Sequence, residues 1–541
     1  MSRRASQRWD QEILLVTWLA ACVSLVSFLY YLRHGDLLLY GDAVAHINIA
    51  RRVFDSRTPG LLQLGTVWLP LPHLLMIPFL LSDRMWQSGV GGSIPSMIAY
   101  VFSVAGIFRL MRSSLSFYLE PGIPERLAAW IAALIFAANP NLIYLQTTAM
   151  TEPLYLAFFI WAVVYFSEWS AADESKSLIK SGGCLFAACL TRYDGWFLAG
   201  LICTVAGLAW IKKKSAVSIS RGSLAKFLLL AAAAPVLWLT YNAVVYRNPL
   251  EFANGPYSAK AIEQKTSVPG YPPHPGTNNL SVAASYFLKA AELNMAESPW
   301  HRLWLALLLA GTLLVMLFSR RLWPLLLLWA PLPFYMLSIA YGGVPIFLPP
   351  WWPFSIYNAR YGIEILPAFA IFSTVAAYFI ARALKQNTAK LTVAAVMIVF
   401  IGLSYFSVWR AQPISFREAW VNSRTRIALE KELANTLERL PAGSTFLMYL
   451  GNHVGAMQAA GIPLRNVINE GNHRTWKQPA DPQGLWEKAL ANPARYVDFV
   501  VSFAGDPVDE AVSRQNLSAL AVIHAAGQPK AVLYRTNRPL R

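Results

Sequence analysis

The chain has 541 residues, of which 56% are hydrophobic and 14% are charged, and its formal net charge is +17. Soluble proteins of this length carry more charge, so the composition excludes an ordinary soluble enzyme. Lysine and arginine recur in short clusters between long apolar runs, which is typical of membrane-protein orientation and not of nucleic-acid binding.

Eleven apolar runs are expected to cross a bilayer as helices, and the run at 177–191 is the short one among them. A twelfth run, 67–81, is also apolar, but Pro70, His73 and Pro78 indicate a re-entrant or membrane-surface helix instead of a span. The expected spans cover about 12–32, 93–110, 127–146, 152–168, 177–191, 195–211, 225–246, 301–319, 322–341, 361–383 and 391–409.

The basic clusters indicate the orientation of these spans. With eleven spans and a cytoplasmic N-terminus, nearly every short cluster, including Lys212 to Lys214, falls on the cytoplasmic side. Counting 67–81 as a full span would place that cluster outside. We therefore expect a multi-pass protein of the inner (plasma) membrane, with a first outer loop at 33–92 and a long outer loop at 247–300.

The tail has a different, soluble-like composition. A helical pattern at about 415–440 is followed by β-like runs at about 445–449, 496–502 and 531–534. The expected fold class is a polytopic α-helical membrane protein with about eleven transmembrane helices in residues 1–410. A small extracytoplasmic α/β domain is expected in residues 411–541.

The first polar feature follows the first span. Asp42 and His46 lie one helical turn apart in a pattern that predicts an amphipathic helix along the membrane surface. Asp42 either caps that helix or acts as a general base held over a cavity. An ionisable group at a membrane boundary is costly, so Asp42 is the leading candidate for a catalytic residue.

Two later turns return to the same side of the membrane. Glu152 favours the positive end of the helix that it begins, but it is also a second acid at the depth of Asp42. Two such acids could share a divalent metal or divide acid and orienting roles. In the next turn, Arg192 and Asp194 either neutralise each other or leave Arg192 facing a phosphate.

Arg360 begins a late span from the outer side. It is a planar, permanently charged donor suited to phosphate, or else an interfacial anchor beside Tyr361. Glu364, one turn deeper, is expected to pair with Arg360 or to line a cavity. The long outer loop carries two stretches rich in Pro and Gly, at 254–265 and 271–276, which predicts irregular backbone there. Its Lys260 either binds phosphate or is solvated, and His274 is a weaker candidate.

No Walker loop, GxSxG elbow, HExxH motif or dinucleotide fingerprint occurs in a suitable strand-turn-helix context. All the candidates are expected on the non-cytoplasmic face, where ATP or a soluble sugar nucleotide is an improbable donor. The remaining chemistry uses a substrate that is delivered in the membrane.

This arrangement resembles the GT-C superfamily of polyprenyl-phosphate-sugar-dependent membrane glycosyltransferases, in particular the protein O-mannosyltransferases and the lipid A aminoarabinose transferases. The resemblance covers most of residues 10–410. It is carried by GDAVAHINIAR at 41–51, WLPLPH at 68–73, ANPN at 138–141, MTEP at 150–153, TRYDGW at 191–196 and ARY at 359–361, with Pro367.

The resemblance implies that Asp42 is the catalytic base, although Gly41 stands where many relatives have a second acid. It implies no certain cofactor, although a divalent metal could bind. The candidates for orienting the acceptor or binding a metal are Glu152, Asp194 and His46. The candidates for binding the donor phosphate are Arg360, Arg192, Lys260 and Tyr361.

The implied activity is transfer of a monosaccharide from a polyprenyl-phosphate donor to an acceptor hydroxyl, by inverting displacement on the extracytoplasmic face. The expected partners are the donor lipid, a glycan, lipid or protein acceptor, and the bilayer, with no nucleic acid. One alternative is a ligase or polymerase of lipid-linked glycans, for which the loop 247–300 is compatible. A lipid flippase or transporter is the non-enzyme alternative, but the sequence has neither midplane polar groups nor a repeated half.

Overall fold

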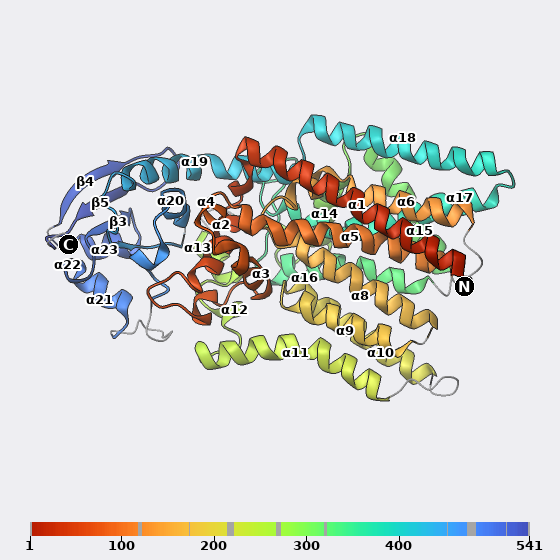
Figure 1. Cartoon of the computed structure of the whole chain (residues 1–541), viewed down its shortest axis with the longest axis horizontal. Helices are drawn as coiled ribbons and strands as arrows, with labels where there is room; N and C mark the ends of the chain where they lie inside the picture. The colour runs from red at the N-terminus through yellow and green to blue at the C-terminus, as the bar shows by residue number, and fades with distance from the viewer. Residues whose placement is uncertain are drawn as a thin grey trace.

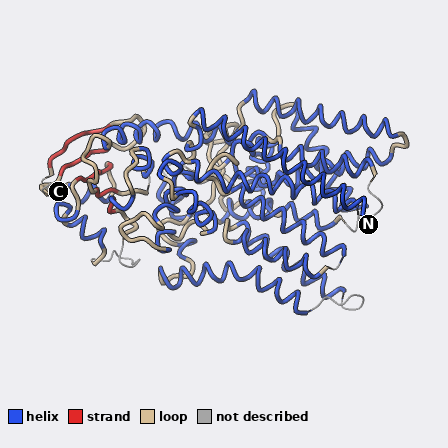
Figure 2. The backbone as a smooth tube through the Cα atoms, viewed as in Figure 1, coloured by secondary structure: helices blue, strands red, loops and turns tan. Residues whose placement is uncertain are grey.

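The computed structural model describes residues 3–116, 122–172, 174–213, 221–266, 272–318, 322–451, 453–472, 483–515 and 517–538. Figure 1 shows an elongated molecule in which long helices run roughly along the long axis. The strands gather at one end, near the C-terminus, and the N-terminus lies at the other end (Figures 1 and 2). Lys214 of the basic cluster lies outside the described residues.

Nine helices among the described residues are long and apolar enough to cross a membrane, so the chain is a multi-pass helical membrane protein. They match nine of the eleven expected spans, and the total of eleven stays a prediction. The other two expected spans hold the shorter helices α6 (Ile123–Ala137), α7 (Pro140–Leu145) and α9 (Ser175–Cys189). The long helices are α1 (Arg3–His34), α5 (Val90–Ser116), α8 (Glu152–Ala172), α10 (Asp194–Lys213), α11 (Arg221–Val245), α15 (Trp300–Phe318), η3 (Trp323–Trp329) with α16 (Pro331–Tyr341), η4 (Ala359–Ile365) with α17 (Leu366–Ala383), and α18 (Asn387–Ala411).

Large apolar side chains are exposed on several of these helices. Trp18 of α1, Leu229 of α11, Phe318 of α15 and Phe406 of α18 are each more than half exposed. In water such a surface would be unfavourable, whereas in a bilayer it faces an equally apolar solvent. The exposed residues therefore indicate the lipid-facing side of the bundle, while α17 lies almost entirely within it.

Most of the short helices from two loops lie between the long helices and the sheet (Figure 1). The first loop carries η1 (Asp36–Leu38), α2 (Gly41–Arg52), η2 (Leu61–Leu64), α3 (Leu71–Leu80) and α4 (Asp83–Gln87). The long loop carries α12 (Glu251–Asn254), α13 (Ala259–Thr266) and α14 (Leu280–Met295). The prediction of irregular backbone was wrong at 259–266, where α13 forms, whereas 272–276 contain no helix or strand. Helix α14 buries one apolar face against α16 and η4.

Helix α2 also differs from its prediction as a membrane-surface helix. Its polar residues His46, Asn48 and Arg51 are each at most 3% exposed. The Asn48 Nδ2 donates to Gln458 Oε1 at 2.6 Å, and the Asn48 Oδ1 accepts from Trp86 Nε1 at 3.0 Å. The polar side of α2 is therefore covered by the tail and by α4. The sequence pattern of α2 could not reveal this, because Trp86 and Gln458 lie far from α2 along the chain.

The tail begins with α19 (Ile414–Leu437), which follows α18 after a single turn at Gln412. The sheet has the order β2-β1-β3-β5-β4, with β1 parallel to β2 and β3, and β5 antiparallel to β3 and β4. The predicted runs correspond to β1, β3 and β5, whereas β2 and β4 were not predicted. The strands are β1 (Phe446–Met448), β2 (Val467–Ile468), β3 (Phe499–Phe503), β4 (Ser518–Ile523) and β5 (Ala531–Arg535), and the remaining helices are α20 (Val454–Ala459), η5 (Leu464–Asn466), α21 (Leu485–Ala491), α22 (Pro493–Tyr496) and α23 (Pro507–Val512).

Asp55 joins the first loop to the tail. Its Oδ2 accepts from Arg51 Nε at 2.8 Å, and its Oδ1 accepts from the backbone N–H and the guanidinium of Arg465, both at 3.2 Å. Asp55 is 2% exposed, so its charge is isolated from water. The predicted boundary at residue 410 stays a prediction, but the two parts are joined by buried polar contacts.

We expect Asp55→Asn to lower the unfolding temperature of the purified protein, because Arg51 would lose a buried counter-charge at a cost of roughly 3 kcal/mol. Asp83→Asn is the matched control. It also removes a partner of Arg51, but the Asp83 side chain is 71% exposed, so the loss should stay below about 1 kcal/mol. Thermal unfolding in one detergent compares the two, and equal shifts would contradict the structural role of Asp55.

Candidate functional site

Asp42 lies in the first turn of α2, on the side of the bundle that faces the tail. The helix begins at Gly41 with Tyr40 as its N-cap, so the prediction that Asp42 caps the helix was wrong. The Asp42 side chain is 42% exposed, and its Oδ2 accepts from Arg360 Nη2 at 2.6 Å. Asp42 is therefore an accessible carboxylate paired with a buried cation.

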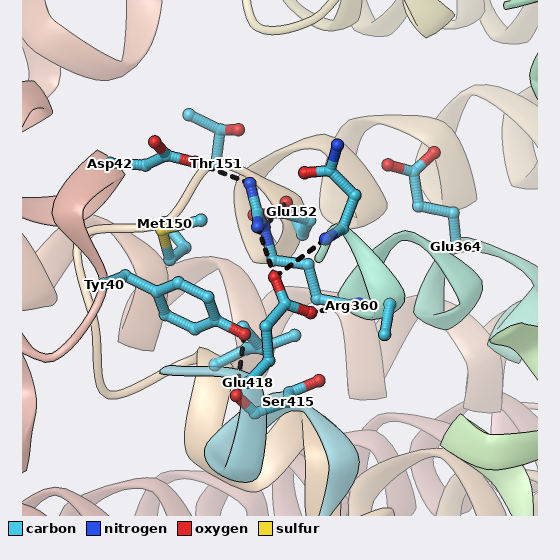
Figure 3. A network of polar contacts seen from close by, with 12 residues as sticks. Tyr40, Asp42, Met150, Thr151, Glu152, Arg360, Glu364, Ser415 and Glu418 are labelled. Atoms are coloured by element: carbon cyan, nitrogen blue, oxygen red, sulfur yellow. Dashed lines mark hydrogen bonds and ion pairs between the residues drawn. The ribbon is translucent and has the colours of Figure 1, made fainter. Parts of the chain in front are cut away.

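Arg360 lies in η4, is 4% exposed, and is surrounded by three carboxylates (Figure 3). Besides the bond to Asp42, its Nε donates to Glu152 Oε1 at 3.1 Å and its Nη1 donates to Glu418 Oε1 at 2.7 Å. A buried guanidinium requires such partners, because an unpaired charge away from water is costly. The three acids come from α2, α8 and α19, so Arg360 joins segments that are far apart in the sequence.

Glu418 was not predicted as a site residue. It is 1% exposed, and its carboxylate also accepts from the backbone N–H groups of Arg360 at 3.0 Å and Asn358 at 3.1 Å. It lies on the buried face of α19 with Ser415 and Ala419, which only the structure reveals. Glu418 fixes both the backbone and the guanidinium of Arg360.

Close packing also holds η4 in place. A Cβ at Gly362 would collide with the backbone of Ala290 in α14, so a larger residue would force the two segments apart. Asn294 of α14 donates its Nδ2 to the carbonyl oxygen of Ala359 at 2.7 Å. The long loop therefore helps to position Arg360 through α14.

Two tyrosine rings flank the Arg360 guanidinium. Its central carbon lies 5.0 Å from the ring centre of Tyr40 and 4.8 Å from that of Tyr361. The Tyr361 ring also lies 5.0 Å from the guanidinium of Arg192, so it separates the two cations. These cation–π contacts add to the ion pairs in holding both arginines.

Arg192 belongs to a second, deeper part of the same network. Its guanidinium contacts Asp194 at 3.2 Å, Glu152 at 3.3 Å and Glu364 at 3.1 Å. The predicted pairing of Glu364 with Arg360 is not made, because Glu364 contacts Arg192 instead. One of the two predictions for this turn was that Arg192 and Asp194 neutralise each other. They do form an ion pair, but Asp194 is only one of several partners of Arg192.

Tyr335 completes this deeper part and was missed in the sequence. Its hydroxyl lies 3.0 Å from Asp194 Oδ2 and 2.8 Å from Glu364 Oε1, and it accepts from Arg192 Nη2 at 2.8 Å. One hydroxyl proton can serve only one of the two acids at a time. A tyrosine in an apolar span gives no sequence signal of such a role.

Glu152 connects the two arginines. Its Oε1 accepts from both Arg360 and Arg192, while its Oε2 is buried and makes no hydrogen bond in the described part of the chain. The network thus contains five carboxylates, from Asp42, Glu152, Asp194, Glu364 and Glu418, around two guanidinium groups. Four of these acids are buried, and only Asp42 among the five is accessible.

The described residues contain no group of three or more His, Cys, Asp or Glu side chains arranged to hold a metal ion. The candidate metal ligand His46 does not contact the acids. Its Nδ1 lies 2.9 Å from His73 Nε2, and its ring lies against Trp68. Burial, together with the charges of Arg360 and Arg192, lowers the pKa of His46 to about 3, so this ring stays neutral at ordinary pH.

The remaining candidates lie outside the network. Lys260 is exposed on α13, and its backbone packs against Gly343, in the segment that leads to Arg360. Within the described ranges, Lys260 makes no hydrogen bond to any residue that also binds Arg192 or Arg360. Both ring nitrogens of His274 contact backbone atoms. The Nε2 lies 2.9 Å from the Ile346 oxygen, and the Nδ1 accepts from the Gly276 N–H at 3.0 Å.

The fold has counterparts among solved structures. ArnT from Cupriavidus metallidurans bound to undecaprenyl phosphate is 13% identical, with a TM-score of 0.56 over 97% of this chain and 98% of that chain. Its apo structure gives a TM-score of 0.57 at the same identity and coverage. The oligosaccharyltransferase of Archaeoglobus fulgidus covers 91% of this chain and 69% of its own, at 12% identity and a TM-score of 0.48.

No protein-family model matches the chain, and no curated protein matches it at a significant level. The likeness to ArnT is structural and extends over both the helical bundle and the tail. The chain therefore shares the fold of ArnT, in agreement with the fold that the resemblance of its sequence motifs implied.

Proposed function

We propose that this protein transfers a single sugar from a polyprenyl-phosphate donor to an acceptor hydroxyl at the extracytoplasmic surface, with inversion at the anomeric carbon. The observation that carries the proposal is the accessible Asp42 carboxylate held against the buried Arg360 in a GT-C fold. One of the ArnT structures contains undecaprenyl phosphate, which supports a polyprenyl phosphate as the lipid carrier here.

In the proposed reaction, Asp42 takes the proton of the acceptor hydroxyl as its oxygen attacks the anomeric carbon. The bond between that carbon and the phosphate oxygen breaks, and polyprenyl phosphate leaves with one more negative charge than the phosphate diester had. Arg360 stabilises this developing charge. The proton then passes to water, because the Asp42 side chain is 42% exposed.

The same arginine cannot hold three carboxylates and a phosphate at once. Glu152 and Glu418 are at most 1% exposed and would need water or another partner to leave Arg360. Asp42 is the accessible partner, so the donor phosphate displaces Asp42 from Arg360. Donor binding thereby frees the base at the moment when an acceptor can be used.

Arg192 has a supporting role in this proposal. Its guanidinium meets five acceptor groups, and its side chain is 13% exposed, so a phosphate would have to break several buried contacts to reach it. We propose that Arg192 and Asp194 position Glu152 and Tyr361 beside Arg360. Lys260 remains a proposed contact for the donor, from the exposed surface of α13.

The direct test of the activity uses purified protein in nanodiscs, a radiolabelled polyprenyl-phosphate monosaccharide and a mixture of candidate acceptors. We expect one labelled sugar to move to an acceptor, with release of polyprenyl phosphate. Transfer of a preassembled glycan chain would favour a ligase, and movement of the lipid without a product would favour a flippase. Either result would overturn the proposal.

We expect Asp42→Asn to reduce turnover by about 100-fold or more, which is the usual contribution of a general base. Binding of polyprenyl phosphate should be retained or tightened, because an amide competes less strongly for Arg360. Asp36→Asn is a control that removes a nearby acid with no bond to Arg360. Near-normal transfer by Asp42→Asn would remove Asp42 from the mechanism, and weaker phosphate binding would contradict its displacement.

We expect Glu418→Gln to lower kcat/KM by roughly 10-fold to 100-fold, since charged hydrogen bonds of this kind contribute about 1.5 to 3 kcal/mol. The loss should appear mainly in donor binding, because Glu418 positions Arg360 and does not touch the reacting atoms. Glu432→Gln, an exposed acid on the same helix, is the matched control. A purely structural role would instead lower the unfolding temperature while the active fraction kept its KM for the donor.

A further inference from the structure

A cavity of about 340 Å³ lies between the first outer loop and the tail, outside the arginine network. It is lined by Arg57 from the loop after α2, by the residues that precede β1, and by residues near β2, α22 and the end of the chain. This volume is at the lower end of the range found for small-molecule sites. None of the residues used by the proposed reaction contributes to its lining.

Arg57 reaches this cavity from a fixed piece of backbone. The two residues beside it are held by Asn472, whose Nδ2 donates to Ser56 Oγ at 3.2 Å and to Thr58 Oγ1 at 2.9 Å. Among the described residues, no hydrogen bond or ion pair is made by the Arg57 guanidinium. An unpaired cation on an ordered backbone is already placed for a ligand, which reduces the entropic cost of binding.

Arg538 meets the same cavity from the other side. Its Nη1 donates to the Tyr496 carbonyl oxygen at 2.8 Å, which orients the guanidinium without neutralising it. No acid pairs with Arg538 in the part of the chain that the structure describes. Partial burial lowers the pKa of Arg57, the charge of Arg538 lowers it further, and the charge of Asp498 opposes both effects.

Asp498 is the acid among the described lining residues, and it is already engaged. Its Oδ2 accepts from the Thr445 backbone N–H at 2.9 Å and from the Thr445 hydroxyl at 2.7 Å. The guanidinium groups of Arg57 and Arg538 therefore face one carboxylate, that of Asp498, which already accepts two hydrogen bonds from Thr445. The rest of the wall includes the Tyr496 ring and the apolar side chains of Ile468 and Leu485.

We propose that this cavity is a binding site for an anionic small molecule, whose phosphate or carboxylate lies between Arg57 and Arg538. A body the size of one sugar would then lie against Tyr496, Ile468 and Leu485. Arginine is the side chain best suited to such anions, because its N–H groups can bind two oxygens at once. This site stands apart from the proposed transfer reaction and does not depend on it.

The test is isothermal titration calorimetry on the full chain in detergent with inorganic phosphate, glucose 1-phosphate and glucuronate as probes. We expect glucose 1-phosphate to bind, and we expect Arg57→Gln and Arg538→Gln each to weaken it by about tenfold or more. Arg514→Gln, an exposed arginine of the tail that does not line the cavity, should bind like the parent protein. Both catalytic-network arginines are present in every variant, so a lost signal reports this cavity alone.

Two outcomes would overturn the proposal: no binding of any probe, or equal affinity in the parent and in both cavity variants. A thermal-unfolding scan with glucose 1-phosphate controls for folding, because a folded variant without the site keeps its own unfolding temperature but loses the ligand-induced rise. Nanodiscs of phosphatidylcholine with or without phosphatidic acid identify the source of the anion. Competition by phosphatidic acid would assign the site to a lipid headgroup, and its absence to a soluble ligand.

Discussion

The structure depends on one buried guanidinium and the three carboxylates that surround it. Arg360 is 4% exposed, and the acids that neutralise it come from α2, α8 and α19. A buried cation is stable only when its partners are in place, so folding must bring the first loop, the bundle and the tail together around this residue. The same requirement gathers Asp42, Glu152 and Arg192 into one network, whether or not each takes part in catalysis.

The three partners of Arg360 differ in their access to water. Glu152 and Glu418 are enclosed by the fold, whereas nearly half of the Asp42 side chain is open. The enclosed pair keeps the arginine charged and oriented at all times, and the open partner can exchange with a ligand. Under the proposed function, this ion pair also protects the cation from other anions until the donor arrives.

Part of this arrangement could be predicted from the sequence, because it follows from topology. Asp42, Glu152, Arg192 and Arg360 each lie where an apolar run meets a polar turn, and counting the spans places all four turns on one side. What could not be predicted is which acid meets which arginine, since that depends on the packing of helices far apart in sequence. Glu364 illustrates this limit: it is one turn from Arg360 but contacts Arg192.

The contacts between the tail and the bundle could not be predicted from the sequence either. Its composition predicts a separate soluble-like unit, yet Glu418 completes the shell of Arg360 and Gln458 pairs with Asn48 of α2. Without these groups, a buried arginine and a buried amide near Asp42 would lose their partners. The geometry of the candidate base therefore depends on residues more than 370 positions away in the chain, which explains why the tail and the bundle are packed as one structure.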